Sequence, residues 1–578
     1  MHELKQISRR PVREDALAQM PAGMHPVLRR VYAARGTSAA ELDTSLAGLV
    51  PISRLDGTDA AADRLCRARI DGKKVLIVGD FDADGATATA LMMNCLRAFG
   101  YAQPAYLVPD REKFGYGLSP GIVHKAAELR PDLIITVDNG ISSLAGVAAA
   151  NELGIDVIVT DHHLPGEQLP AAKVIVNPNA PGNSFPSKYL AGVGVAFYVM
   201  AALGQRLATE GLIGAADARA ICAGCLDLVA LGTVADLVPL DFNNRILVAQ
   251  GLARMRRGGA RPGIAALFAA ANRSPANAIA ADLGFAVAPR LNAAGRLDDM
   301  SIGIECLLAG TAERAGKYAG MLSQLNAERR ELQRKMQDDA ELRMDELAGF
   351  SVAHAENGVC LFDPTWHPGV VGLVATRIKD RVNRPVIAFA SGSADGNLKG
   401  SGRSVGGVHL RDVLAAVDAK NPGLITRFGG HAMAAGLSLP PQSLEPFRAA
   451  FIAEVARHTD AIDDTARLWS DGELEPPDIG LQLAEELRVA GPWGQAFPEP
   501  SFDGHFRVVG QKIVGESHLK LELIPEGGDQ LIGAIAFNRS ELLPVARGGT
   551  CRAVYRLDVN EFRRQRSAQL VVEHIDCV

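Results

Sequence analysis

The stretch KKVLIVGDFDADGATATA, residues 73–90, constrains the fold more than any other part of the chain. Residues 75–78 form a short β-branched apolar run of the kind that a parallel sheet buries on both faces. Three aspartates, Asp80, Asp82 and Asp84, follow at alternate positions. If the chain stays extended, alternate side chains lie on one side. We therefore expect these carboxylates at the carboxyl end of a strand, where open α/β sheets hold ligands.

Carboxylates that point the same way repel one another, so such an arrangement needs a cation or a network of hydrogen-bond donors. The alternative is a solvated, aspartate-rich loop in which one aspartate caps the next helix. Gly85 permits the turn into that helix, which we expect over residues 86–97. The rest of the chain decides between the two interpretations.

Apolar runs alternate with alanine-rich helical segments along the first half of the chain. The runs cover residues 75–78, 104–108, 133–137, 155–159 and 174–176. This alternation is typical of an α/β domain with a doubly wound parallel sheet. We assign that domain to residues 51–300.

The remaining segments differ in character. We expect a helical segment over residues 1–50 and one long connecting helix over residues 301–348, which contain no proline and have apolar residues at helical spacing. A second α/β domain is expected over residues 349–464. Residues 465–578 contain alternating strands such as HLKLELI and QLIGAIAF, which indicate a small all-β barrel, and we favour an OB-fold.

Composition narrows the class of protein. A chain of 578 residues is too long for one hydrophobic core, and a net charge of −6 leaves any polyanion site to a local basic surface. The N-terminus lacks the apolar core of a signal peptide, and the longest apolar stretch is shorter than the ~20 residues that span a bilayer. We expect a cytoplasmic protein that is not in a membrane. The CxxC of Cys222 and Cys225 is interpreted as structural rather than zinc-binding or redox-active.

Acidic residues and histidines recur where other strands of the sheet are expected to end. Residues 133–137 lead to Asp138, residues 155–160 to Asp161, His162 and His163, and residues 228–234 to Asp236. Because the carboxyl ends of parallel strands meet at one edge, these side chains should converge on one crevice. Carboxylates with imidazoles suit Mn²⁺, Mg²⁺ or Fe²⁺ better than a structural zinc.

The surplus of carboxylates indicates two cations rather than one. Two metals ~3.5–4 Å apart need a bridging ligand and carboxylates on each side. Asp138, alone at its strand end, is the candidate bridge. Such a pair lowers the pKa of a shared water and clamps a phosphoryl group, which indicates phosphoester hydrolysis.

Several motifs occur in a recognisable order. GDFDADG, VDNG, TDHH and GTVADLVPL resemble the DHH phosphoesterase superfamily. RLNAAGRL, WHPGVVGLVATR, GSGRS and GGHAMAAG resemble its RecJ branch, the bacterial exonucleases specific for single-stranded DNA. The resemblance covers about residue 50 to the C-terminus, and the ordered set is far more specific than a lone DHH tripeptide.

The resemblance implies metal binding at the positions that match the motifs, which are Asp80, Asp82, Asp84, Asp138, His162 and Asp236. It implies a catalytic set in which His163 faces the scissile phosphate beside Asp138, while Asp161 orients the adjacent histidine. Pyrophosphatase-like members carry a metal-binding histidine where this chain has Val78. Which carboxylate serves which metal therefore stays open.

The second α/β domain is similar to the domain that grips nucleic acid in this family. Residues in its motifs, or in segments that lead to them, are implied to bind substrate: Arg111, Tyr116, Arg290, Arg296, His367, Arg377, Ser401, Arg403 and His431. A guanidinium can bind a phosphate through two hydrogen bonds. We expect Ser401 and Arg403, joined by Arg111, to hold a 5′-terminal phosphate. Tyr116 is either a base-stacking residue or a turn residue.

Together these features predict a two-metal, 5′→3′ exonuclease that uses Mn²⁺ or Mg²⁺ and hydrolyses single-stranded DNA to 5′-mononucleotides in repair and recombination. One alternative is a phosphodiesterase of short oligonucleotides, which usually lacks an OB segment. Another is a non-catalytic DNA-binding scaffold, in which the metal positions would be eroded. We expect a monomer, with single-stranded-DNA-binding protein and helicases as candidate partners. Activity on RNA is left open.

Overall fold

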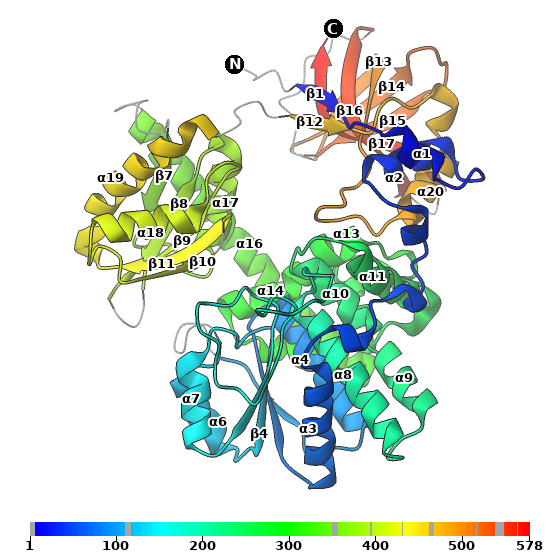
Figure 1. Ribbon diagram of the computed structural model, residues 1–578. Helices are drawn as coiled ribbons and strands as arrows, with labels where there is room; N and C mark the ends of the chain where they lie inside the picture. The colour runs from blue at the N-terminus through cyan, green and yellow to red at the C-terminus, as the bar shows by residue number, and fades with distance from the viewer. Residues whose placement is uncertain are drawn as a thin grey trace.

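The computed structural model describes residues 6–109, 117–348, 357–392, 396–430, 432–461, 467–515, 517–537, 548–562 and 565–577. Two α/β domains and a C-terminal barrel are visible in Figure 1, and the first α/β domain is the largest of the three. Arg111, Tyr116 and His431 lie outside the described residues.

The first α/β domain contains a parallel sheet of five strands in the order β3-β2-β4-β5-β6. Its strands are β2 (Val75–Gly79), β3 (Ala105–Leu107), β4 (Leu133–Val137), β5 (Asp156–Thr160) and β6 (Val174–Val176). Val75 and Ile77 belong to the core on one face of the sheet, and Leu76 and Val78 to the core on the other. The doubly wound parallel sheet is therefore confirmed. Because β3 and β4 lie on opposite sides of β2, the chain reverses its direction of winding between β2 and β4, the switch point where such sheets bind ligands.

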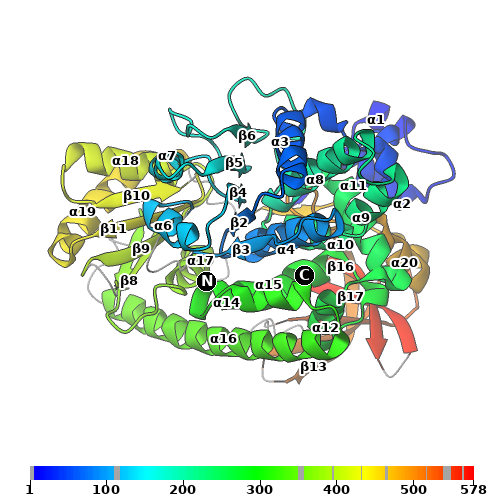
Figure 2. The ribbon, with the colours of Figure 1, turned by 90° about the horizontal axis from the view of Figure 1, so that it is seen from below.

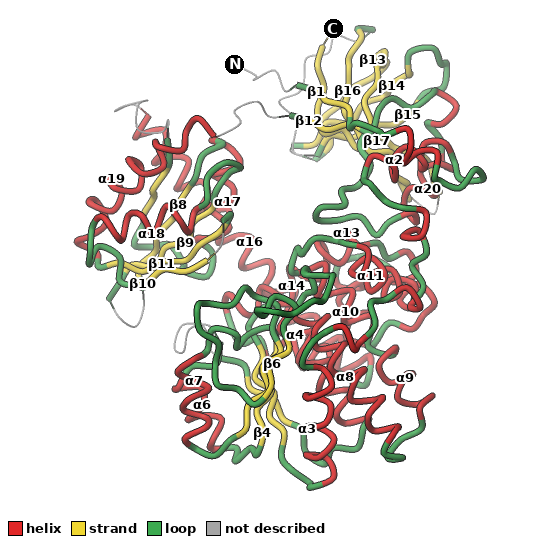
Figure 3. Tube along the Cα trace, in the orientation of Figure 1, coloured by secondary structure: helices red, strands yellow, loops and turns green. Residues whose placement is uncertain are grey.

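Helices cover both faces of this sheet, as the red segments of Figure 3 show. On one side lie α6 (Pro120–Glu128) and α7 (Leu144–Glu152). The other helices of the domain are α3 (Thr58–Ile70), α4 (Ala83–Ala98), α8 (Gly192–Thr209), α9 (Ala215–Ala223), α10 (Leu226–Ala235), α11 (Phe242–Arg254), α12 (Pro262–Ala270), α13 (Ala280–Asp282) and α14 (Ala288–Leu297). The segment Ala215–Ala235 has the length and hydropathy of a membrane span, but 61% of its most apolar window is buried, as in the core helices of globular domains.

The long connecting helix begins later than the sequence suggested. Residues Ser301–Leu308 form a separate helix, α15, and the long helix α16 spans Ala312–Ala348. The residue after α15, Ala309, is extended, and Thr311 Oγ1 accepts a hydrogen bond from the N–H of Arg314 at 3.3 Å. This side-chain cap starts a new helix where the expected one would have continued. Figure 2 shows α16 running from the first domain to the second α/β domain.

The second α/β domain has a mixed sheet in the order β10-β11-β9-β8-β7, in which only β7 and β8 are parallel. Its strands are β7 (Val359–Phe362), β8 (Val386–Ser391), β9 (Leu398–Arg403), β10 (Arg427–Gly430) and β11 (Ala434–Leu439). Its helices are α17 (Val371–Val382), α18 (Leu410–Lys420) and α19 (Leu444–Val455). Two apolar clusters lie on the two faces of this sheet, so it has its own core.

The C-terminal strands close into a barrel in the order β13-β14-β15-β17-β16. They are β13 (Phe502–Val514), β14 (His518–Pro525), β15 (Ile532–Ala536), β16 (Thr550–Phe562) and β17 (Gln565–Cys577), with α20 (Leu481–Ala490) before them. The predicted all-β barrel is confirmed. In β14 buried residues alternate with more accessible ones, because every second side chain points into the barrel.

The N-terminal segment packs on this barrel, which the sequence did not indicate. The short strand β1 (Ile7–Arg9) pairs in parallel with β12 (Leu468–Ser470), and helices α1 (Glu14–Ala18) and α2 (Pro26–Ala34) follow. Arg35, just after α2, donates hydrogen bonds to both carboxylate oxygens of Asp471 at 2.7 and 3.0 Å. The side chains of Arg35 and Asp471 are 3% and 0% exposed. A buried ion pair therefore joins the N-terminal segment to the segment that leads into the barrel.

Replacing Arg35 with alanine should weaken the attachment of the N-terminal segment, because Asp471 would remain buried without its main cation. Breaking such a pair from one side costs about 3–5 kcal/mol. The urea midpoint followed by the fluorescence of Trp469 and Trp493 should fall. An Arg13→Ala control should leave it unchanged, because the ion pair of Arg13 with Asp15 is exposed. Equal midpoints for Arg35→Ala and wild type would contradict this account.

Candidate metal centre and nucleic-acid cleft

The three aspartates after β2 do not continue in an extended chain, as the alternation had suggested. Helix α4 begins at Ala83, three residues earlier than expected, so Asp82 is its N-cap and Asp84 lies in its first turn. Asp82 Oδ1 accepts hydrogen bonds from the N–H groups of Asp84 and Gly85, both at 3.0 Å. The side chain of Asp84 turns to the start of α8, where the N–H groups of Gly192 and Val193 donate to its two oxygens at 2.6 and 2.9 Å. Two helix N-termini therefore help to hold these carboxylates.

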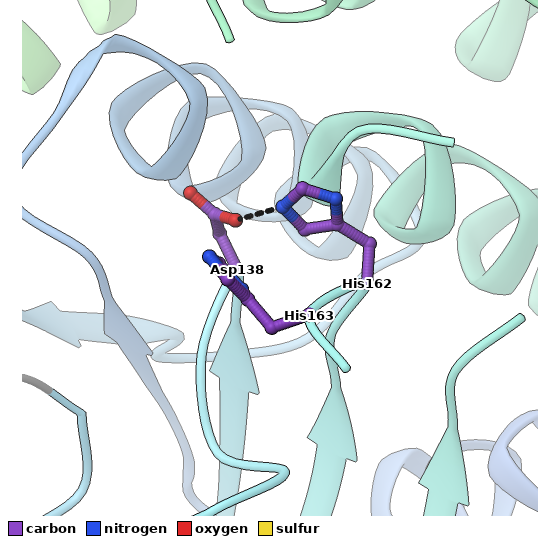
Figure 4. Close-up of side chains that lie close together, drawn as sticks. All are labelled: Asp138, His162 and His163. Atoms are coloured by element: carbon purple, nitrogen blue, oxygen red, sulfur yellow. Dashed lines mark ion pairs between the residues drawn. The ribbon is translucent and has the colours of Figure 1, made fainter. Parts of the chain in front are cut away.

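Asp138 and His162 extend this cluster from the ends of β4 and β5 (Figure 4). His162 Nε2 lies 3.1 Å from Asp138 Oδ1 and 3.5 Å from Asp236 Oδ2. Asp138 has a left-handed backbone, with φ of 61°, which aims its side chain away from the course of the strand. Three sets have ligand atoms within 4.8 Å of one another: Asp80, Asp82 and Asp138; Asp84, His162 and Asp236; and Asp138, His162 and His163. All six predicted metal ligands thus lie together.

Asp236 reaches the cluster from a different element than expected. Residues 228–234 are not a strand but part of helix α10, and Asp236 is its C-cap. A carboxylate at a helix C-terminus meets the negative end of the helix dipole, so this position adds to the demand for a cation.

The electrostatics of the cluster favour bound cations. Burial, followed by the charges of neighbouring carboxylates, raises the pKa values of Asp80, Asp138 and Asp236 well above the ordinary range, and raises the pKa of Asp84 to about 7. Among the described residues, the buried Oδ1 of Asp80 has no hydrogen-bond donor. Divalent cations would supply the missing charge, and carboxylates with one or two imidazoles are suitable ligands for Mn²⁺ and Mg²⁺. The donor set therefore fits the predicted metals.

Asp161 plays a different part, because donors already surround it. Its Oδ1 accepts from the N–H groups of His162 and His163 and from His163 Nδ1 at 2.8 Å, and its Oδ2 accepts from the N–H of Ile141. Burial, the largest single influence, would raise the pKa of Asp161 and lower that of His163. Their hydrogen bond and the attraction of the opposite charges around each group together outweigh burial, so the pKa of Asp161 is lowered and that of His163 is raised. Asp161 belongs to none of the three ligand sets. Its geometry is that of a residue that orients His163.

A cleft of about 2010 Å³ lies between the two α/β domains and reaches the metal cluster at Phe81 and His163. Of the predicted substrate-binding residues, it is lined by Arg296, His367, Ser401 and Arg403. Alternate residues of β9 face it, which also places Lys399 on its wall. Arg411 and Arg427 also line the cleft. The sequence analysis identified none of these three basic residues. Only Lys399 had a signal, because it alternates with Ser401 and Arg403 along β9.

The structure separates two other predicted residues from this cleft. The guanidinium of Arg290 donates to Ser323 Oγ and to the carbonyl of Ala270, both at 3.1 Å, and so holds α14 against neighbouring helices. Arg377 is exposed on α17, on the side away from the buried face of that helix, and does not line the cleft. The prediction that these two arginines reach substrate is not supported by their positions.

Two residues that position the cluster had no signal of their own in the sequence. Asn292 of α14 accepts a hydrogen bond from the N–H of Ala83 at 2.8 Å and thereby fixes the start of α4. Gly192 packs so closely on Asp138 that an added Cβ would lie 2.5 Å from the Cβ of that residue. Both contacts join segments far apart in the chain.

Comparison with known proteins agrees with the geometry. Residues 74–233 match the model of the DHH family, N-terminal domain, residues 352–457 match the DHHA1 domain, and residues 470–574 match the RecJ OB domain. The fold and the cluster of carboxylates and histidines at its switch point therefore define a protein of the DHH class.

Relatives narrow the class to one family. The chain is 52% identical to the single-stranded-DNA-specific exonuclease RecJ of Dickeya dadantii and 50% identical to that of Escherichia coli, in both cases over 100% of each chain. It superposes on the crystal structure of RecJ from Thermus thermophilus in complex with Mn²⁺ with a TM-score of 0.80, at 30% identity, over 99% of this chain and 79% of that one. A second structure of that protein contains Mg²⁺. The chain belongs to the RecJ family.

A methyl group on Gly192 should disturb the metal centre without unfolding the domain. Gly192→Ala would displace Asp138, and changes that reorient a ligand typically weaken metal binding by about 10- to 100-fold. Calorimetric titration with Mn²⁺ should show this loss, while circular dichroism stays as in wild type. Gly316→Ala is the control, because an added Cβ in α16 meets nothing within 4 Å. Wild-type Mn²⁺ affinity in a folded Gly192→Ala protein would show that Asp138 does not hold metal.

Proposed function

We propose that this protein is a metal-dependent 5′→3′ exonuclease that hydrolyses single-stranded DNA to 5′-mononucleotides in DNA repair and recombination. The observation that carries the proposal is the continuity of the basic cleft with the cluster of carboxylates and histidines at His163. RecJ relatives at about half identity over the full chain, named as single-stranded-DNA-specific exonucleases, support it.

The proposed ligands of two Mn²⁺ or Mg²⁺ ions are Asp80, Asp82, Asp84, Asp138, His162 and Asp236. Such ions activate water and stabilise the charge that develops on a phosphoryl group. Because the carboxylate of Asp161 engages Nδ1 of His163, that nitrogen carries its proton. The other ring nitrogen, Nε2, is then the atom through which His163 would contact the scissile phosphate. Asp138 would bridge the two ions.

The cleft would hold the end of the strand. Ser401 Oγ and the guanidinium of Arg403 lie 3.1 Å apart on one face of β9, a pair suited to a terminal phosphate. Arg296 and His367 would contact the backbone of the adjoining nucleotides. Arg111, Tyr116 and His431 remain predictions on the motifs alone. Selectivity for single strands would be steric, since the two domains would leave a passage too narrow for a duplex.

On the resemblance, we further propose that the protein acts in the cytoplasm as a monomer. Single-stranded-DNA-binding protein and helicases would then be the partners that present its substrate.

Digestion of single-stranded and duplex DNA of one sequence, labelled at either end, tests the activity. With Mn²⁺ or Mg²⁺ the wild type should release mononucleotides from the 5′ end of the single strand, and EDTA should abolish this release. Asp138→Ala should lower the rate by at least about a hundredfold, since it removes a ligand from both ions. Asp71→Ala is the matched control, because that exposed residue precedes β2 at the opposite edge of the sheet.

Three results would contradict this proposal. Tight binding without cleavage in every metal would indicate a scaffold, and cleavage confined to very short oligomers would indicate an oligonucleotide phosphodiesterase. Release from the 3′ end would reverse the proposed polarity.

Arg403→Ala should abolish the preference for a 5′-phosphate over a 5′-hydroxyl end. A hydrogen bond to a charged group contributes about 1.5–3 kcal/mol, so KM for the phosphorylated strand should rise roughly 10- to 100-fold. KM for the hydroxyl strand should change little. Arg377→Ala should behave as wild type on both strands, because its side chain lies outside the cleft. A preference that survives Arg403→Ala would place the terminal phosphate elsewhere.

A further inference from the structure

Phe285 is an aromatic side chain whose place in the fold has no structural explanation. It is 86% exposed, the most exposed large apolar side chain in the described part of the chain. It lies in a single π-helical turn, η6 (Leu283–Val287), between α13 and α14. Such turns are rare and are frequently found at functional sites. Phe285 therefore buries little apolar surface and is not part of the core.

The position of η6 connects this ring to the metal centre. A Cβ built on Gly284 would lie 3.3 Å from Val234 Cγ1, and Val234 precedes the proposed ligand Asp236 by two residues. Leu237, directly after Asp236, is 69% exposed and has a left-handed backbone with φ of 58°, which is uncommon for a leucine. Two exposed apolar side chains thus belong to segments that meet near the carboxyl end of α10, where Asp236 lies.

The helix that follows η6 leads from Phe285 to the cleft. From α13 through η6 to α14 the chain is one continuous helical run. Asn292 and Arg296 are four residues apart on it, so these two side chains share one face. On that face Asn292 contacts the start of α4, and Arg296 donates to the carbonyl of Gly369 across the cleft. Phe285 lies near the amino end of the same run, about 16 Å from Arg296 along its axis.

We infer that Phe285 stacks on a nucleobase of the single strand on the 3′ side of the scissile phosphate. The inference rests on the proposed function. If the 5′ end lies in the cleft beside Arg403, the strand passes His163 at the metal centre and leaves on the side of Asp236, where Phe285 lies. Figure 1 shows α13, which precedes this turn, at the edge of the first domain that faces the barrel. An aromatic face binds any base, as a sequence-independent exonuclease requires.

The test moves a single abasic nucleotide along 5′-phosphorylated 20-mers and measures KM and kcat for release of the first nucleotide in Mn²⁺. In the wild type, base loss at one internal position should raise KM about tenfold with little change in kcat. Phe285→Ala should raise KM about tenfold on the unmodified strand and show no further rise at that position. Phe285→Trp should restore the position-specific effect. Ile70→Ala, which alters another exposed apolar side chain at the amino edge of the sheet, should match wild type.

The outcomes separate the two proposals. A wild type that digests no strand would overturn the proposed function and this inference together. A wild type that digests DNA but shows no position-specific effect would overturn only the assignment to Phe285. So would an effect of equal size in wild type and Phe285→Ala, or a Phe285→Ala protein with unchanged KM.

Discussion

Repulsion among buried carboxylates at the β2–β4 switch point is the constraint on which this structure depends. Asp80 and Asp138 follow adjacent strands, and Asp84 and Asp236 lie at helix ends beside them. Each is desolvated, and the charges of neighbouring carboxylates raise its pKa further. The protein offsets part of this cost with N–H groups at the starts of α4 and α8. The remainder calls for divalent cations, so the same charges that oppose folding create the affinity for cations.

The neighbouring elements serve to hold that cluster at a fixed place in the cleft. Helix α14 touches the loop after β2 through Asn292, and through Arg296 it touches Gly369 of the second α/β domain. The loop that carries Asp80 and Asp82 is thus linked to the wall that carries Arg403 by one rigid helix. The 37-residue helix α16 sets the distance between the two domains in a way that a flexible linker would not. The second domain would therefore position the substrate, while the proposed metal ligands all come from the first domain.

The features that could be predicted from the sequence are those formed by residues close together in the chain. Contacts between segments far apart in the sequence could not be predicted. The buried strands and the six proposed ligands could be identified, because each is a local pattern. Residues 228–234 were assigned to the wrong element, since a short apolar run does not distinguish strand from helix. Arg290 and Arg296 come from one motif, but six residues along a helix place them on different sides, and only Arg296 faces the cleft. The hydrogen bond of Asn292 to Ala83 spans 209 positions and left no local signal.

The barrel is joined to the first domain by contacts in which the N-terminal segment takes part. Trp493 and Phe497 stack on each other next to Tyr32, and the guanidinium of Arg245 lies 4.3 Å from the centre of the Phe497 ring. The N–H of Leu240 donates to the carbonyl of Gln495 at 2.8 Å. Leu240 is four residues after Asp236, so the barrel is tied close to the metal centre through a short, well-packed connection. A DNA strand bound by the barrel would therefore lie at a fixed distance from the proposed metal site. Binding at the barrel would in this way help to position the scissile phosphate.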